Sequence, residues 1–201
     1  MDSAPWPDHA DYVAPTVRTA VKLLISGPFA VGKTTLVGSV SEIAPLRTEE
    51  VMTEASITVD DLADVPSKDT TTVAMDFGRI TLGNGRVVLY LFGAPGQDRF
   101  HPLWRDLAYG ALGALVLIDP RRIDRSFDTL NMVEEHNLPY AVACNNFDGA
   151  PAIPDDQLRA ALDLDTDTPL VTCDARERAS SMNALIALVH HLHSRTSKEH
   201  V

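Results

Sequence analysis

Gly27-Pro-Phe-Ala-Val-Gly-Lys-Thr34 fits the pattern G-x-x-x-x-G-K-[ST]. The apolar run before it, residues 21–26, predicts a buried strand, and the apolar spacing of residues 34–41 predicts a helix after it. Glycines in such a position let the backbone wrap around a phosphate, because glycine tolerates positive φ and close approach. The backbone N–H groups and the helix N-terminus then favour negative charge. We therefore expect Lys33 to reach the β- and γ-phosphates of a nucleotide and Thr34 to ligate Mg²⁺.

The composition is that of an ordinary soluble protein. The 201 residues suffice for one substantial core, with 45% hydrophobic and 22% charged residues. The net charge of −11 argues against nucleic acid or an anionic membrane surface as the main partner. No apolar run approaches the length of about 18 residues that spans a membrane, so we expect no direct membrane insertion. Cys144 and Cys173 lie in apolar runs, which favours buried thiols in a reducing cytoplasm.

Three parts of the chain differ in character. Residues 1–17 are rich in proline and acidic residues and predict an irregular arm. Residues 18–195 carry the pattern of one domain, and residues 196–201 form a tail. Within the domain, the polar stretch 43–71 holds seven acidic residues against two basic ones. It predicts either a solvated loop or a surface that faces a basic partner.

The domain alternates strands and helices, which predicts an α/β fold. Beyond residue 71 the expected strands are 72–82, 86–92, 113–118, 140–144 and 170–173, and the expected helices are 126–135, 158–162 and 179–193. Asn84-Gly85 between the first two of these strands is a strong hairpin signal. This order predicts a mostly parallel sheet with one antiparallel hairpin and helices on both faces. Ligands of such sheets bind at the carboxyl ends of the strands.

Gly93-Ala-Pro-Gly-Gln97 follows one of these strands directly. At that position the Gly96 N–H can meet a γ-phosphate, and Gln97 can orient an attacking water. A plain Pro-Gly turn is the alternative interpretation.

Two further segments bear on the choice of base. Asp148 in Asn145-Asn-Phe-Asp148 can accept hydrogen bonds from guanine N1–H and its exocyclic amine, a donor pair that adenine lacks. The Ala175 N–H, in Cys173-Asp-Ala175, can meet guanine O6. The alternative for the first segment is an Asn/Asp turn that leads into Gly149.

From about residue 20 to residue 193 the chain resembles the Ras-like small GTPases. Within them it resembles the bacterial MglA-type polarity GTPases and, more closely, the small GTPases of actinobacterial conservon operons. Thr70-Thr-Thr-Val-Ala-Met-Asp-Phe-Gly78, Gly-Ala-Pro-Gly-Gln97 and Asn-Asn-Phe-Asp148 carry the resemblance. It implies a P-loop NTPase fold: a six-stranded, mostly parallel sheet with one antiparallel edge hairpin and about five helices. It also implies binding of GTP/GDP with Mg²⁺, slow GTP hydrolysis, and two switch loops at residues 45–72 and 93–108.

The resemblance also implies residue roles. Lys33 and Gln97 would be catalytic, and Thr34 and Thr72 would hold the metal, with Thr70 and Thr71 as close rivals of Thr72. The nucleotide would be held by Gly27, Phe29, Ala30, Val31, Gly32, Lys33, Thr34, Thr35, Gly96, Asn145, Asn146, Asp148, Asp174, Ala175 and Arg176. The implied partners are a roadblock-type regulator and a sensor-kinase-like membrane protein, through which a cytoplasmic chain would lie peripheral to the membrane.

Four departures from the family pattern matter. Gly93 stands where most Ras-like proteins carry an Mg²⁺-supporting aspartate, and Asp76 on the neighbouring strand is a candidate substitute, with a solvated strand residue as the alternative. Asn146 replaces a lysine that packs along the base. Phe29 adds bulk where relatives often have glycine, and no arginine immediately precedes Thr72. Without an arginine finger, phosphoryl transfer lacks a contribution of ~10³–10⁵ in rate, so we expect slow turnover.

Three functions fit these residues. The first is a GTP-driven switch whose output is partner binding. The second is a nucleotide-bound scaffold without hydrolysis, which Gly93 and Phe29 favour and Gln97 disfavours. The third is an ATP-using phosphotransferase with an arginine-rich lid at residues 121–125, against which Asn145 and Asp148 speak.

Overall fold

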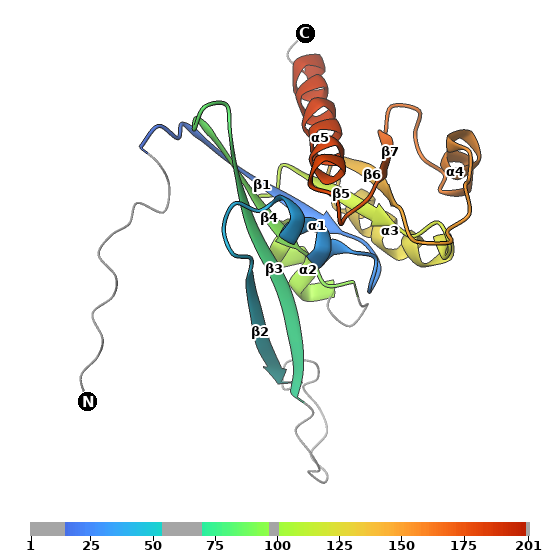
Figure 1. Ribbon diagram of the computed structural model, residues 1–201, viewed down its shortest axis with the longest axis horizontal. Coiled ribbons are helices and arrows are strands. Elements are labelled where there is room, and N and C mark those ends of the chain that lie inside the picture. Colours follow the sequence, from blue (N-terminus) through green and yellow to red (C-terminus); the bar gives the residue numbers. More distant parts are fainter. Residues whose placement is uncertain (1–14, 54–69, 97–100, 200–201) are drawn as a thin grey trace.

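The computed structural model describes residues 15–53, 70–96 and 101–199 (Figure 1). Its strands are β1 Thr19–Ser26, β2 Leu46–Thr53, β3 Thr70–Leu82, β4 Val87–Gly93, β5 Gly113–Ile118, β6 Tyr140–Asn145 and β7 Leu170–Cys173. Its α-helices are α1 Lys33–Val40, α2 His101–Ala108, α3 Phe127–Glu135, α4 Asp155–Ala161 and α5 Arg178–Glu199. A 3₁₀ turn, Ile123–Ser126, leads into α3. No helix in the described ranges combines the length and apolar character that crossing a membrane requires.

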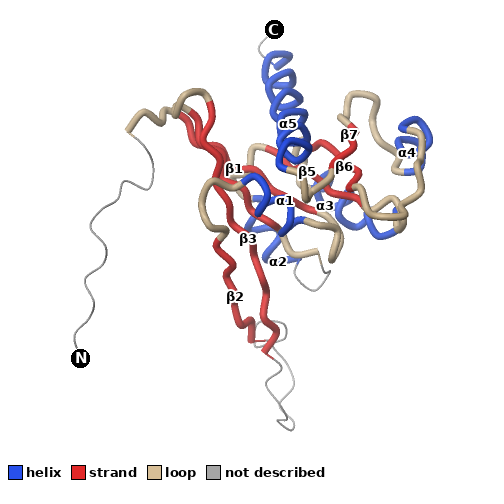
Figure 2. Tube along the Cα trace, viewed as in Figure 1, coloured by secondary structure: helices blue, strands red, loops and turns tan. Residues whose placement is uncertain are grey.

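The described strands form one mixed sheet in the order β2-β3-β4-β1-β5-β6-β7 (Figure 2). Strand β1 pairs in parallel with β4 on one side and β5 on the other, and β6 and β7 continue the parallel part. Strand β3 runs antiparallel to both β2 and β4. The chain leaves β1 toward β2–β4 and later crosses to β5–β7, so the strand order reverses at the carboxyl end of β1. Ligands of open α/β sheets bind at such a switch point.

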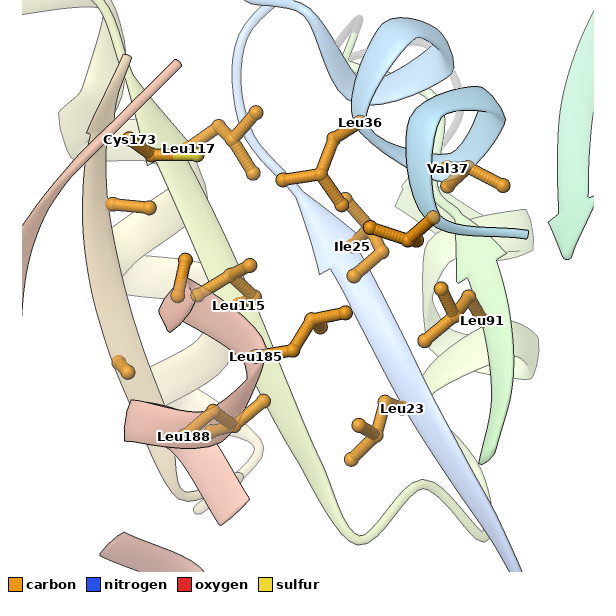
Figure 3. Close-up of a cluster of buried hydrophobic side chains, with 14 of the residues drawn as sticks. Leu23, Ile25, Leu36, Val37, Leu91, Leu115, Leu117, Cys173, Leu185 and Leu188 are labelled. Atoms are coloured by element: carbon orange, nitrogen blue, oxygen red, sulfur yellow. The ribbon is translucent and has the colours of Figure 1, made fainter. Parts of the chain in front are cut away.

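Two hydrophobic layers cover the two faces of the sheet. Helices α1 and α5 pack on one face, where Leu36 and Leu185 meet Ile25 and Leu117 (Figure 3). Helices α2, α3 and α4 pack on the other face. Successive residues of β1 alternate between the layers, with Leu23 and Ile25 on one side and Leu24 on the other. Because its side chains alternate between the two faces of the sheet, β1 contributes to both hydrophobic cores.

The P-loop NTPase fold expected from the sequence is confirmed, with a mostly parallel sheet and five described α-helices. The sheet gains a seventh strand, because β2 lies within the stretch 43–71 that was expected to be a polar loop. The antiparallel β3–β4 hairpin is consequently not the edge of the sheet; β2 is. Residues 46–53 do not alternate between apolar and polar residues, so their sequence pattern does not predict a strand. Backbone pairing to β3 holds them at the edge of the sheet.

Candidate functional site

Residues 27–34 form a tight loop between the end of β1 and the start of α1. Gly27 and Gly32 have positive φ, +140° and +106°, and Ala30 also lies in the left-handed region at +63°. A Cβ at position 27 would lie 2.4 Å from the Leu117 carbonyl oxygen, and one at position 32 would lie 2.6 Å from Asn145 Nδ2. Both positions therefore require glycine, and the loop exposes backbone N–H groups at the N-terminus of α1, where negative charge is favoured.

Lys33 lies across this loop. Its Nζ donates hydrogen bonds to the carbonyl oxygens of Gly27 and Pro28, both at 2.7 Å. Burial lowers the pKa of Lys33 to about 8, although the charge of Asp76 works in the opposite direction. A desolvated ammonium of this kind interacts strongly with an anion, because little water screens it.

Asp76 of β3 reaches the same loop. Its side chain is 7% exposed, and the Thr34 hydroxyl donates a hydrogen bond to its Oδ2. Asp76 pairs in register with Gly93 of β4, and a Cβ on Gly93 would lie 3.0 Å from the Asp76 Cβ. The small residue at position 93 thus leaves room for a carboxylate that comes from the neighbouring strand. Asp76 is not a solvated strand residue.

Gly96 lies against the phosphate loop. A Cβ at this position would come within 2.4 Å of the Gly27 carbonyl oxygen and 2.7 Å of the Phe29 backbone nitrogen. The residues before Gly96 lie beside β1, because the Ala94 N–H donates a hydrogen bond to the Ile25 carbonyl oxygen at 2.9 Å. Gln97 lies outside the described residues.

Asn145 joins three parts of the site at the end of β6. Its Nδ2 donates to the Val31 carbonyl oxygen at 2.8 Å, and its Oδ1 accepts the Ala175 N–H at 3.0 Å. The side chain is buried, so these bonds fix the phosphate loop against the ends of β6 and β7. The Ala175 N–H, which was expected to be available to guanine O6, is engaged by Asn145 in this structure.

A cavity of about 170 Å³ opens beside Asn145. It is lined by Ala30, Gly32, Thr35, Asn145, Asn146, Phe147, Asp174, Ala175 and Arg176. Arg176 holds Asp174 through two hydrogen bonds, from Nε at 2.9 Å and from Nη2 at 2.8 Å, which lower the pKa of that carboxyl. Its Nη1 also contacts Asp148 Oδ1 at 3.2 Å. The side chain of Asp148 is 92% exposed, so its ion pair with Arg176 is weak. Another hydrogen-bond donor can therefore replace Arg176 at the carboxylate.

Arg121 holds the segment 145–148 from the side of β5. Its backbone N–H and Nε donate to Asp119 Oδ1, both at 2.9 Å, and its Nη2 donates to Oδ2 at 2.8 Å. These bonds lower the pKa of the Asp119 carboxyl. The guanidinium carbon lies 3.9 Å from the centre of the Phe147 ring. Sequence reasoning missed this contact, because no short motif signals a stack between residues so far apart in the chain.

Thr72 is the other expected metal ligand. It lies in β3 with Val51 as its register partner, four residues before Asp76 along the strand. At about 3.3 Å per residue, its backbone is roughly 13 Å from the strand position that meets Thr34. No group of three or more His, Cys, Asp or Glu side chains within the described residues could hold a metal.

The fold and the loop at the end of β1 are those of the P-loop NTPases. The chain belongs to the family described as conserved hypothetical ATP binding proteins, whose model matches residues 25–195. No curated protein matches the chain.

Two solved structures share the fold. The G domain of the FeoB iron transporter of T. maritima superposes with a TM-score of 0.60 at 18% identity, covering 86% of this chain and 98% of that chain. The FeoB G domain from Methanococcus jannaschii gives a TM-score of 0.58 at 14% identity, covering 87% and 99%. At such identities the likeness concerns the fold.

Proposed function

We propose that the protein is a guanine-nucleotide switch that binds GTP and GDP with Mg²⁺ and hydrolyses GTP slowly. The observation that carries the proposal is the bridge of Asn145 between Val31 and Ala175. It places the loop that would hold the phosphates beside the cavity that would hold the base. The Asp148 carboxylate contacts Arg176, which lines this cavity, and among the hydrogen bonds of the described residues it has no other partner. A guanine edge supplies two N–H donors to such a carboxylate.

ATP is the second candidate, because the family is described as ATP-binding. Adenine presents its N1 lone pair where guanine presents N1–H, so a carboxylate in that position repels it. Equilibrium binding of GTP, GDP and ATP in the presence of Mg²⁺ separates the two. Tight guanine binding with weak ATP binding supports the switch, and equal or tighter ATP binding overturns it.

The switch would act through partners and slow turnover. By the resemblance to MglA-type and conservon GTPases, we infer a roadblock-type regulator and a sensor-kinase-like membrane protein as partners of a cytoplasmic chain. The acidic residues between positions 49 and 69 support a basic partner surface. Phe29, with 67% of its surface exposed, would crowd an incoming arginine finger, which is consistent with slow hydrolysis.

A scaffold that binds nucleotide without cleaving it stays a distinct alternative. A single-turnover assay of the wild type and Gln97→Leu separates it from the switch. Cleavage by the wild type that Gln97→Leu abolishes supports a hydrolase. No cleavage by either protein favours the scaffold.

In the proposed switch Mg²⁺ would be held by Thr34 and by the nucleotide phosphates, with Asp76 orienting Thr34. Asp76→Ala is expected to weaken the Mg²⁺ contribution to GTP affinity by about 10–100-fold, because supporting carboxylates orient metal ligands. The measurement is a titration of GTP binding against free Mg²⁺. Asp128→Ala, which removes an exposed carboxylate on α3, is the matched control.

A swap variant sharpens this test. Asp76→Gly combined with Gly93→Asp moves the carboxylate from β3 to the position paired with it on β4. If the role is to supply a carboxylate to Thr34, the double variant regains most of the Mg²⁺ dependence that Asp76→Gly alone loses. An unchanged Mg²⁺ dependence in Asp76→Ala refutes the role of Asp76.

Arg121 is expected to substitute for the missing lysine at position 146 by steadying the segment 145–148. Arg121→Ala should raise the dissociation rate of GDP by about 2–5-fold, because an exposed cation–π contact contributes ~0.5–1 kcal/mol and this energy corresponds to that change in rate. Arg121→Lys should recover part of this, and Arg18→Ala is the exposed control. Stopped-flow release of a fluorescent GDP measures the rate. Equal rates for Arg121→Ala and the control contradict the expectation.

A further inference from the structure

A second cavity lies beside the phosphate loop, separate from the one proposed for the base. Its volume is about 230 Å³, and it is lined by Pro28, Phe29, Ala30, Val31, Asp119, Arg121, Arg122 and Arg125. One wall is thus the outer side of the phosphate loop, and the other is the segment between β5 and α3. Ala30 is the one residue that lines both cavities.

Only some of the charged groups around this cavity have a partner of opposite charge. Asp119 is neutralised by the hydrogen bonds and ion pair of Arg121. Arg122 contributes a field that lowers the pKa of Asp119, but within the described residues neither Arg122 nor Arg125 makes a side-chain hydrogen bond or salt bridge. The remaining acid on this turn is the exposed Asp124, which does not line the cavity. The cavity therefore holds two uncommitted guanidinium groups in a chain with a net charge of −11.

We propose that this cavity is an oxyanion-binding site in which Arg122 and Arg125 hold a phosphate or carboxylate group beside the phosphate loop. Guanidinium groups bind both anions through paired, charge-assisted hydrogen bonds. The exposed Phe29 ring adds an apolar wall for the carbon atoms that carry the anion. The volume suits an anionic head group with a few carbons. This site is distinct from the proposed nucleotide site and does not depend on which base is bound there.

An occupied oxyanion site would be coupled to the phosphate loop. Residues 28–31 form its wall, and their backbone also encloses the proposed phosphate position. Any effect of the anion on nucleotide affinity must be matched by an equal effect of the nucleotide on anion affinity.

The test is a titration of the full chain, free of nucleotide, followed by NMR at constant ionic strength. The probes are inorganic phosphate and glutarate, a dicarboxylate. The Nε–Hε signals of Arg122 and Arg125 report on the oxyanion site, and the backbone amides of Gly32 and Lys33 report on the phosphate loop. These separate readouts keep a failure of this site distinguishable from a failure of nucleotide binding.

We expect saturable shifts of the two arginine signals with at least one probe. Arg122→Gln with Arg125→Gln should weaken the corresponding saturation, followed at the Nε–Hε signal of Arg121 on the same cavity wall, by about tenfold or more, because each guanidinium supplies charge-assisted bonds. Arg86→Gln, an exposed arginine at the β3–β4 turn, should leave it unchanged. Thermal melting of the double variant checks that these exposed substitutions leave the fold intact.

The two probes distinguish the source of the anion. Saturation by phosphate alone assigns the site to a phosphoryl group, and saturation by glutarate alone assigns it to an acidic side chain. Shifts that rise without saturation, or that the double variant retains in full, overturn the proposal.

Discussion

Lys33→Ala is expected to remove nearly all affinity for nucleoside di- and triphosphates. The buried ammonium lies across the loop between the Gly27 and Pro28 carbonyl oxygens and would supply charge-assisted bonds to two phosphates. At about 1.5–3 kcal/mol for each bond, the loss is roughly 10²–10⁴-fold in the dissociation constant. Isothermal titration of GDP and GTP measures it. Lys22→Ala, which removes an ammonium bound to the Tyr109 carbonyl oxygen outside the site, should bind as the wild type does.

The pH dependence gives this prediction a signature that a folding defect would not produce. Burial lowers the pKa of Lys33 to about 8 in the free chain, whereas bound phosphates would hold its proton. Nucleotide affinity should therefore fall as the pH rises through about 8, and binding above that pH should take up a proton. Lys33→Ala should lack this dependence. A wild-type affinity that stays constant from about pH 7 to about pH 9 would show that Lys33 does not meet the phosphates.

Lys33 favours nucleotide binding, but its lowered pKa makes the folded state less stable. A lysine whose pKa is lowered in the folded state makes the charged form costly there. Its destabilising effect is full below pH about 8 and disappears as the pH rises toward the ordinary lysine value of 10.5. The site therefore holds a charge that the fold alone does not favour, which is typical of groups kept for ligand binding.

The parts of the fold that the sequence predicts are those with strong local patterns. Residues 23–25 and 114–118 are apolar throughout, and the structure places both in the buried centre of the sheet. Strand β2 has no such pattern, because its place depends on pairing with β3. Helix α2 lies in the stretch 93–108 that the resemblance assigns to the second switch, and the local pattern predicted no helix there. Helix α5 also continues to Glu199, beyond the expected end of that helix at residue 193.

The candidate site follows the same rule. The motif at residues 27–34 predicts its own conformation, because its glycines and its lysine act locally. The position of Asp76 depends instead on the register in which it pairs with Gly93, and a slip by one residue would turn the carboxylate to the other face of the sheet. The contact of Arg121 with Phe147 depends on the packing of β5 beside β6, which no local pattern encodes.

Asp148→Asn is the second prediction with a large effect, since it should exchange guanine for xanthine as the preferred base. The carboxylate accepts two hydrogen bonds from guanine in the proposed complex, so its loss should weaken GDP binding by about 10²–10⁴-fold at ~1.5–3 kcal/mol per bond. The side-chain oxygen of an asparagine can instead accept the N1–H of xanthine, and its NH₂ group can donate to the C2 carbonyl oxygen of xanthine. Competition of GDP, XDP and ADP against a fluorescent nucleotide measures the exchange.

The matched control is Asp174→Asn. Asp174 lines the base cavity and holds Arg176 with two hydrogen bonds, yet it has no proposed contact with the donor edge of guanine. It should lower the affinities for GDP and XDP together, whereas Asp148→Asn should reverse their order. The Arg176 contact to Asp148 is exposed and contributes little, so its loss cannot mimic the reversal. If both variants instead lower all affinities in parallel, Asp148 acts only by holding Arg176, and the base must be recognised elsewhere in the cavity.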